Sequence, residues 1–225
     1  MHTLRLSATL AVFALSASLG LSAVTLVQTS DPGFYNNSIG TLLNSTNGGE
    51  TGMFPISDDG SYTFPTAPNL STASAALGNW LTNPLSLNAN WQSLASIPNS
   101  WTIGTEVAVM YQFNTLGATN VVGRFGVDNG IFVWLDGVYI GGARQGGGVS
   151  LGEHTFNLGN LSSGTHFLQL LLEDHGSANG YAVQITADTF IPGPPPTAGV
   201  PDSGSTTVLL GLALAGIVAL RRKLL

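Results

Sequence analysis

Acidic and amide side chains follow the apolar segments in the second half of the chain, and their oxygen atoms are the ligands that calcium prefers. Calcium takes about six to eight oxygens, many of them from carboxylates on loops. If the loops meet at one end of a sandwich, they would form a calcium site from these residues: Asp128, Asn129, Asp136, Glu173 and Asp174. Asp-Asn-Gly and Asp-Gly are also favoured in tight turns for backbone reasons alone, which is the alternative interpretation.

Three tryptophans, Trp80, Trp91 and Trp101, lie in an irregular stretch that Pro84 and Pro98 interrupt. An indole face stacks well on the C–H face of a pyranose, so these residues are candidates for a sugar-binding platform. Tryptophans in such stretches also close the ends of sandwich cores. No spacing rule in the sequence separates the two interpretations.

Catalytic motifs are absent from the sequence: it contains no Gly-x-Ser-x-Gly, His-x-His or His-Glu-x-x-His pattern. Glu173, Asp174 and His175 are adjacent at the end of an apolar segment, where such residues usually face solvent. We therefore expect a protein that is not an enzyme. A secreted glycan-active enzyme is the least favoured alternative, since folding can bring paired carboxylates together without a local motif.

Short β-strands are the elements that would position these side chains. In the segment 106–113, Val107, Val109, Tyr111 and Phe113 alternate with Glu106, Ala108 and Gln112, which is the pattern of a half-buried strand. Asp136-Gly137 predicts a two-residue hairpin. A short helical segment is expected at 72–77, with Gly78 as its end, and further strands at 24–28, 53–56, 62–64, 121–127, 131–135, 138–140, 155–158, 165–173 and 181–188.

This arrangement of strands predicts an all-β fold, an antiparallel sandwich or jelly roll, because no βαβ alternation occurs. The domain should span residues 24–189, with turn formers dominating 29–79 and a glycine-rich loop at 141–148. Residues 190–199, with the run Pro194-Pro195-Pro196, are expected to form an extended linker.

Both ends of the chain predict export. Residues 1–23 have the pattern of a secretory signal, with Arg5 ahead of an apolar run. At the other end, an uncharged run from Ser205 to Leu220 precedes Arg221, Arg222 and Lys223. A helix from Gly204 to Leu220 would be about 25 Å long, slightly less than a bilayer core of roughly 30 Å. The cations would lie on the cytoplasmic side of the membrane. A plain C-terminal membrane anchor and a buried core helix are the alternatives.

Residues 200–225 resemble the exosortase-processed sorting tails of the PEP-CTERM type, in the variant whose motif reads Val-Pro-Asp-Ser-Gly. The motif stands here as Val200, Pro201, Asp202, Ser203 and Gly204, followed by the apolar run and the basic cluster in the same order. The resemblance implies export, transient membrane anchoring, and cleavage near the motif by an exosortase-type membrane protease. That protease would act alongside exopolysaccharide production.

Residues 125–188 resemble the lectin-type β-sandwich of the anthrax protective-antigen family. The resemblance rests on Asp128-Asn129-Gly130, an apolar strand, Asp136-Gly137, and the later Leu161-Ser-Ser-Gly-Thr-His166 before a long strand. It implies sugar binding, often through calcium held by an acidic pair. Asn129 stands where that family has its second acid, which removes one charge from such a site.

Charge excludes one class of partner. All twelve carboxylates lie between Asp31 and Asp202, and that interval contains only two basic side chains, Arg124 and Arg144, so nucleic acid is not an expected partner. The chain contains no cysteine, so its stability depends on its core or on bound metal.

Together these features predict an exported, exosortase-sorted surface or matrix protein whose sandwich binds carbohydrate. A purely structural matrix or adhesion protein is the alternative.

Overall fold

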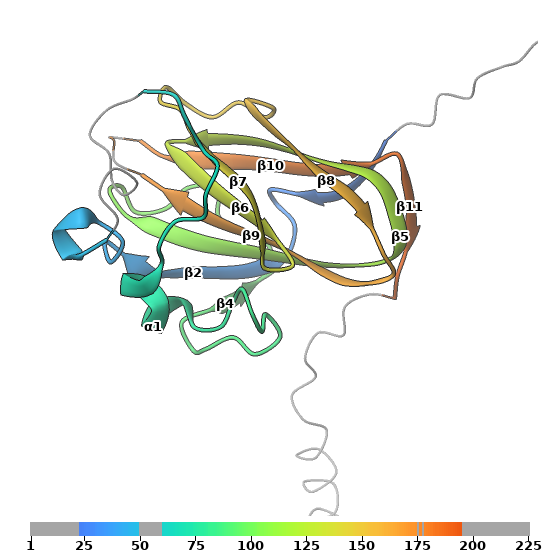
Figure 1. Ribbon diagram of the computed structural model, residues 1–225, viewed down its shortest axis with the longest axis horizontal. Coiled ribbons are helices and arrows are strands. Elements are labelled where there is room, and N and C mark those ends of the chain that lie inside the picture. The colour runs from blue at the N-terminus through green and yellow to red at the C-terminus, as the bar shows by residue number, and fades with distance from the viewer. Residues whose placement is uncertain (1–22, 50–59, 175, 177, 195–225) are drawn as a thin grey trace, which may run out of the picture.

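One very long strand organises the domain, in which eleven strands form a continuous antiparallel network (Figure 1). The structure is a computed structural model that describes residues 23–49, 60–174, 176 and 178–194. The helical segments are η1 (Ser45–Asn47), η2 (Ser71–Ala73) and α1 (Ser74–Leu77). The strands are β1 (Val24–Gln28), β2 (Gly33–Gly40), β3 (Tyr62–Phe64), β4 (Gln92–Leu94), β5 (Glu106–Asp128), β6 (Gly130–Leu135), β7 (Val138–Arg144), β8 (His154–Leu161), β9 (Gly164–Glu173), β10 (Gly180–Ala187) and β11 (Thr189–Pro192).

The long strand β5 belongs to both layers of the sandwich. Its first half pairs with β2 and β9, and its second half pairs with β8, β10 and β11. Figure 1 shows the strand curving from one layer into the other. The layer around the first half continues from β9 through β6 and β7 to β3, while β10 carries β1 at the edge of the other layer. The predicted all-β sandwich is confirmed.

Two hydrophobic cores lie on opposite faces of the first layer. The core between the layers takes Val107, Val109 and Tyr111 from β5 together with alternate leucines of β9. The second core takes Ala108 and Met110 from the other face of β5 and packs them against α1 and the tryptophan-containing segment after it. The alternation in β5 was therefore predicted correctly, but the prediction of a half-buried strand was wrong because a second core covers its other face.

The turns behave largely as the sequence predicts. Asp136 and Gly137 have φ angles of 52° and 78°, as a primed hairpin turn between β6 and β7 requires. The short helix at 74–77 ends at Gly78, whose φ is 63°. Asp136 accepts hydrogen bonds at Oδ1 from the Phe167 amide (2.8 Å) and at Oδ2 from His166 Nδ1 (2.7 Å), which fastens the hairpin to the start of β9.

Several boundaries differ from the prediction. The expected strands at 106–113 and 121–127 are one strand, and β7 continues to Arg144 through the first part of the expected glycine-rich loop. Residues 33–40, expected to be turns, form β2 and pair with β4 and β5. Residues 190–192, assigned to the linker, belong to β11, where Phe190 pairs with Ala118.

Several predicted segments fall on residues that the structure does not describe. Residues 1–22 of the expected signal at 1–23, the expected strand at 53–56, the sorting motif and the apolar run before the basic cluster lie outside the described residues. Within the described ranges, no helix has both the length and the apolar character needed to cross a bilayer.

Candidate functional site: a buried acidic cluster

Acidic side chains from two neighbouring strands meet at one end of the first layer. Glu106 begins β5 and Glu173 ends β9, and they flank the paired residues Val107 and Leu172. Both glutamates are fully buried. The register continues this row across the sheet, since Glu173 pairs with Gly130 of β6 and Gly130 pairs with Arg144 of β7. We call Glu106, Asp128, Glu173, Asp174 and Arg144 the acidic cluster.

Gly130 provides the space that the Glu173 side chain occupies. A Cβ atom at this position would lie 2.6 Å from Glu173 Cγ, closer than real carbon atoms approach. The absence of a side chain on β6 therefore allows a carboxylate of β9 to lie across the neighbouring strand. On the far side of the gap, the guanidinium of the fully buried Arg144 lies 4.4 Å from the centre of the Tyr62 ring.

The two buried glutamates make no hydrogen bonds through their carboxylates to described residues, because all four oxygens lack a partner. The pKa of Glu106 is raised to about 8, chiefly by burial; the negative charge of Asp174 acts in the same direction, and the residue's own backbone amide opposes it. Burial also raises the pKa of Glu173 to about 8, with Arg144 opposing the shift and the other three acids adding to it. At neutral pH these groups must bind protons or a cation.

Asp174 and Asp128 are also buried, but their carboxylates accept hydrogen bonds from protein groups. Asp174 accepts hydrogen bonds from the amides of Gly104 (2.5 Å) and Gly176 (3.0 Å). Asp128 Oδ1 accepts one from the Asn129 side-chain amide (2.9 Å), and the peptide bond between these two residues is cis. The Asn129 backbone amide donates to the Glu173 carbonyl at 3.2 Å, which holds the segment after β5 against the end of β9.

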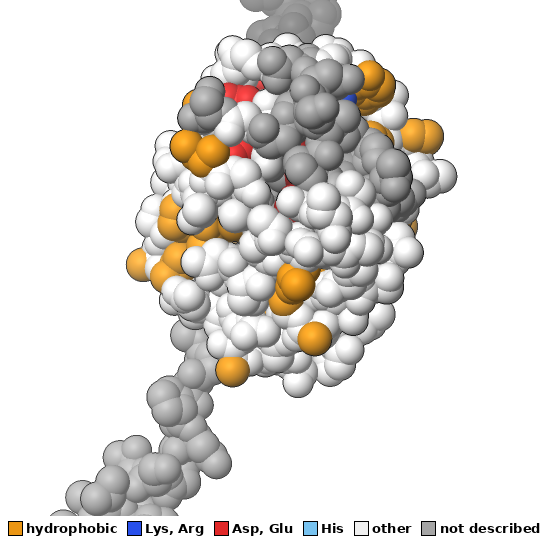
Figure 2. All heavy atoms as spheres, turned by 90° about the vertical axis from the view of Figure 1, so that its left-hand side faces the viewer, with side chains coloured by type: hydrophobic (Ala, Val, Ile, Leu, Met, Phe, Trp, Pro, Cys, Tyr) orange, Lys and Arg blue, Asp and Glu red, His pale blue; other side chains and the backbone are white. Residues whose placement is uncertain are grey.

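The atoms at this end that could bind a metal ion are oxygens, which suit calcium or magnesium better than a transition metal. Among the described residues, no three acidic or histidine side chains already surround a common point at ligating distance. A cation held by Glu106 and Glu173 would therefore take its other ligands from amide and carbonyl oxygens or water, as calcium sites commonly do. Figure 2 looks onto this end of the domain, where acidic atoms reach the surface in one area.

Four of the five residues expected to bind a cation come together, and the fifth does not. Asp128, Asn129, Glu173 and Asp174 lie at the cluster, as the repulsion between their carboxylates and their hydrogen bonds show. Asp136 lies at the opposite end of β6, in the hairpin that contacts the start of β9. Placing Asp136 with the others was wrong, because a strand of six residues separates it from Gly130.

The three tryptophans do not form an exposed platform. Trp80 and Trp91 are 2% and 8% exposed and pack together in the second core, with ring centroids 5.5 Å apart. Trp91 Nε1 donates to the Leu77 carbonyl at 3.0 Å. Trp101 is partly buried against the first core and donates through Nε1 to the Thr105 carbonyl at 2.7 Å. These rings stabilise the fold, and the buried faces of Trp80 and Trp91 leave no surface for a pyranose.

Two members of the cluster were not among the predicted site residues. Glu106 alternates onto the same face as Ala108, and nothing in the local sequence indicates that a second core covers this face. Arg144 was placed in a glycine-rich loop. The one available signal was its charge, since Arg144 is one of only two basic residues among the acidic residues of the domain.

Comparisons with known proteins agree with the expected tail. Residues 199–224 match the VPDSG-CTERM motif, which confirms the sequence assignment for the tail. A search of curated proteins found no match. Two similar solved structures are a PA14 sugar-binding domain from an RTX adhesin and the PA14 domain of the antifreeze protein MpAFP.

The first of these is 14% identical, with a TM-score of 0.34, and the match covers 73% of this chain and 95% of that one. The second is 12% identical, with a TM-score of 0.32, and the match covers 74% and 88%. Both belong to the family that residues 125–188 were expected to resemble. Similarity at this level gives no information on what this chain binds.

Proposed function

We propose that this is an exported protein, sorted at the membrane by an exosortase-type protease, whose β-sandwich binds secreted polysaccharide outside the cell. The observation that carries the proposal is the VPDSG-CTERM match at residues 199–224, which follows an all-β domain directly. Within the tail, the apolar run ahead of Arg221, Arg222 and Lys223 suits transient anchoring with the cations inside. A tail anchored in this orientation would leave the sandwich outside the cytoplasm.

Carbohydrate binding fits the surface of the domain better than binding of a charged partner does. Asn, Ser, Thr and Gln supply most exposed polar groups of the described strands, while ionised side chains are few. Such groups donate and accept hydrogen bonds without charge, as sugar hydroxyls do. This composition supports the proposal and excludes polyanions such as nucleic acid, for which basic residues would be required.

Calcium at the acidic cluster is part of the same proposal. The orphaned carboxylates of Glu106 and Glu173 support it, because a divalent ion would neutralise two buried charges that otherwise require protons. Calcium bound only by the folded state would raise the melting temperature in proportion to the logarithm of its concentration. It would hold together the ends of β5 and β9, with the segment around Asn129 beside them.

Sorting is tested by replacing Asp202 with Ala in the producing cell. If a membrane protease reads the motif, the variant stays in the membrane fraction with its tail intact. The parent is released with a lower mass, measured on the intact protein. Asp188→Ala removes an exposed carboxylate of the domain and serves as the matched control, which should be released normally. Equal release of the Asp202 variant and the parent would refute sorting through this motif.

Binding is tested with the full chain in mild detergent and polysaccharide isolated from the producing cells. Co-sedimentation is measured in millimolar calcium and in EDTA. Binding in either condition supports the polysaccharide-binding part of the proposal, and weaker binding in EDTA would show that a bound ion contributes to it. An absence of binding in either condition would favour the purely structural alternative. A melting curve that does not change across millimolar calcium would exclude the ion independently.

A further inference from the structure

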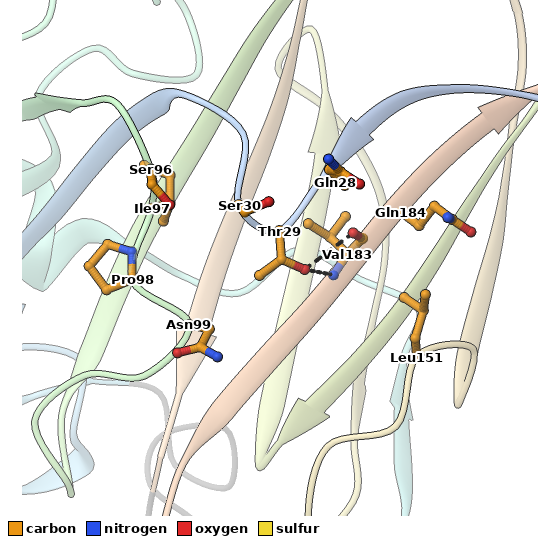
Figure 3. A pocket seen from close by; sticks show the side chains of 10 residues that line it. All are labelled: Gln28, Thr29, Ser30, Ser96, Ile97, Pro98, Asn99, Leu151, Val183 and Gln184. Atoms are coloured by element: carbon orange, nitrogen blue, oxygen red, sulfur yellow. Dashed lines mark hydrogen bonds between the residues drawn. The ribbon is translucent and has the colours of Figure 1, made fainter.

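A hollow of about 580 Å³ lies along β10, away from the acidic cluster (Figure 3). It opens where β1 leaves the sheet: β1 ends at Gln28, which pairs with Gln184 of β10. Beyond this point, no strand among the described residues pairs with this edge of β10. Its volume lies within the range of roughly 300–1,000 Å³ that is usual for small-ligand sites. We call this space the β10 hollow.

The floor and walls of the β10 hollow are fixed by hydrogen bonds and close packing. Thr29 Oγ1 accepts from the Val183 amide (2.8 Å) and donates to the Val183 carbonyl (3.3 Å), which closes the open edge. On one side, the Tyr181 amide donates to the Asn99 carbonyl at 3.0 Å. On the other side, the loop bearing Leu151 is held by the amide of Gly152, which donates to the Phe125 carbonyl at 3.2 Å.

Polar groups without charge face this preformed space. The lining includes amide and hydroxyl side chains that make no hydrogen bond with any described residue: Gln28, Ser30, Ser96, Asn99 and Gln184. Figure 3 shows them on both sides of the hollow, around Thr29 and Val183. Because their protein partners are absent, their donors and acceptors are available to a ligand. Holding them on fixed walls lowers the entropy cost of binding.

Apolar contacts complete the lining. Ile97 and Val183 are buried, while Pro98 and Leu151 present exposed apolar surface, and Leu151 is 48% exposed. None of the lining residues is charged. An ionised group entering here would lose its water without gaining a counter-charge. The ligand that fits has many neutral hydroxyls and an apolar C–H face, which are the properties of a neutral sugar ring.

We propose that the β10 hollow binds a neutral saccharide, one or two rings of a longer chain, through Asn99 and Gln184 on its opposite sides. This inference rests on the proposed function, because it names the sugar class and the place of contact for the polysaccharide binding proposed above. The hollow lies over β10, so this contact does not use the carboxylates of the acidic cluster. Binding should therefore not require calcium.

Arg124 is the charged residue that argues most directly against a neutral ligand. It pairs with Gln184 across β5 and β10 and is exposed, although it does not line the hollow. An acidic saccharide could reach it from the rim. The test must therefore compare neutral and acidic saccharides of the same length.

The test uses the full chain in mild detergent and four variants. Asn99→Ala with Gln184→Ala removes a hydrogen-bonding side chain from each side, and Ser30→Trp fills the hollow. Asn37→Ala with Gln92→Ala removes the same two side-chain types from exposed positions on β2 and β4, as the matched control. Glu173→Gln reports on the acidic cluster. Each variant must first show a melting temperature close to that of the parent at the assay pH, except Glu173→Gln, whose stability is expected to change.

Affinity is measured by calorimetry for neutral gluco-, galacto- and manno-oligosaccharides and for an oligogalacturonide. We expect the parent to bind a neutral oligosaccharide equally in calcium and EDTA, and the double variant to lose at least about tenfold in affinity, since two neutral hydrogen bonds are removed. Ser30→Trp should abolish binding, and the matched control and Glu173→Gln should retain it.

Two results would overturn the inference while leaving the proposed function in place: equal binding by the parent and both hollow variants, or loss of binding only in Glu173→Gln. Preference for the oligogalacturonide would overturn the neutral class. Failure of the parent to bind any saccharide or the isolated polysaccharide would overturn both proposals together. If Ser30→Trp is unfolded, the double variant decides the outcome alone.

Discussion

Replacing Glu173 with Gln should stabilise the protein at neutral pH when divalent cations are removed. Gln keeps the shape of the protonated carboxylic acid but needs no proton. The folded parent must keep Glu173 mostly protonated at pH 7, because burial raises its pKa to about 8. In the unfolded chain the same group ionises near the ordinary glutamate pKa of 4.5. Folding of the parent therefore requires proton uptake that folding of the variant does not.

The magnitude follows from the two pKa values. One pKa unit corresponds to about 1.4 kcal/mol, so binding this proton at pH 7 costs the folded parent about 3 kcal/mol. For a domain of this size, 3 kcal/mol corresponds to a shift in melting temperature of about 6–12 °C. The sign is fixed by the raised pKa: the parent is most stable below pH 4.5 and loses stability as the pH rises through about 8. Near pH 4.5 the two proteins should be equally stable.

The assay is urea unfolding from pH 4.5 to pH 8.5 in EDTA, followed by tryptophan fluorescence. Asp188→Asn, which changes an exposed carboxylate, is the control and should shift stability by less than about 0.5 kcal/mol at any pH. Added calcium should reverse the order of parent and variant if the ion uses the Glu173 carboxylate. The reasoning is refuted if, in EDTA at pH 7, the Gln variant is no more stable than the parent.

Three further substitutions test the packing around the site by urea unfolding. Trp80→Ala should lower the free energy of unfolding by about 3–5 kcal/mol, because it empties the centre of the second core; a loss under 1 kcal/mol would contradict the burial of this ring. Asp136→Ala should cost about 1–3 kcal/mol by leaving the Phe167 amide without its acceptor, and calcium should not change that cost. Gly130→Ala should cost about 1–3 kcal/mol through overlap with Glu173, and much of this loss should disappear in a Glu173→Ala background; additive effects would show that the two positions do not touch.

Local patterns in the sequence predicted the fold well where the local sequence alone determines the geometry of an element. The alternation in residues 165–173 and the Asp136-Gly137 turn each determine their own geometry, and both appear as expected. The sequence of β2 contains Asn36-Asn37, a turn signal, yet pairing with β4 and β5 holds it extended. Tertiary pairing of this kind overrides local propensity and cannot be seen in one segment alone.

The site was predicted only in part, for a related reason. Asp128, Asn129, Glu173 and Asp174 follow strands, and strand ends on one side of a sandwich come together. Glu106 joins them because β5 runs antiparallel to β9 in a particular register. Register depends on the whole sheet and is not a local property. The burial of the tryptophans could not be predicted for the same reason. It depends on how the segment after α1 packs on the outer face of the first layer.

The position of β11 has a mechanical consequence for a protein held by its C-terminal tail. Tension along the tail would enter the domain at Pro192, and β11 is attached to β5 by a short ladder and by the hydroxyl pair of Thr119 and Thr189. Most of its side chains are exposed, so pulling it away would uncover little of either core. Under load β11 would detach first and lengthen the tether, and the sandwich that carries both candidate sites would stay folded until the force reached the main sheet.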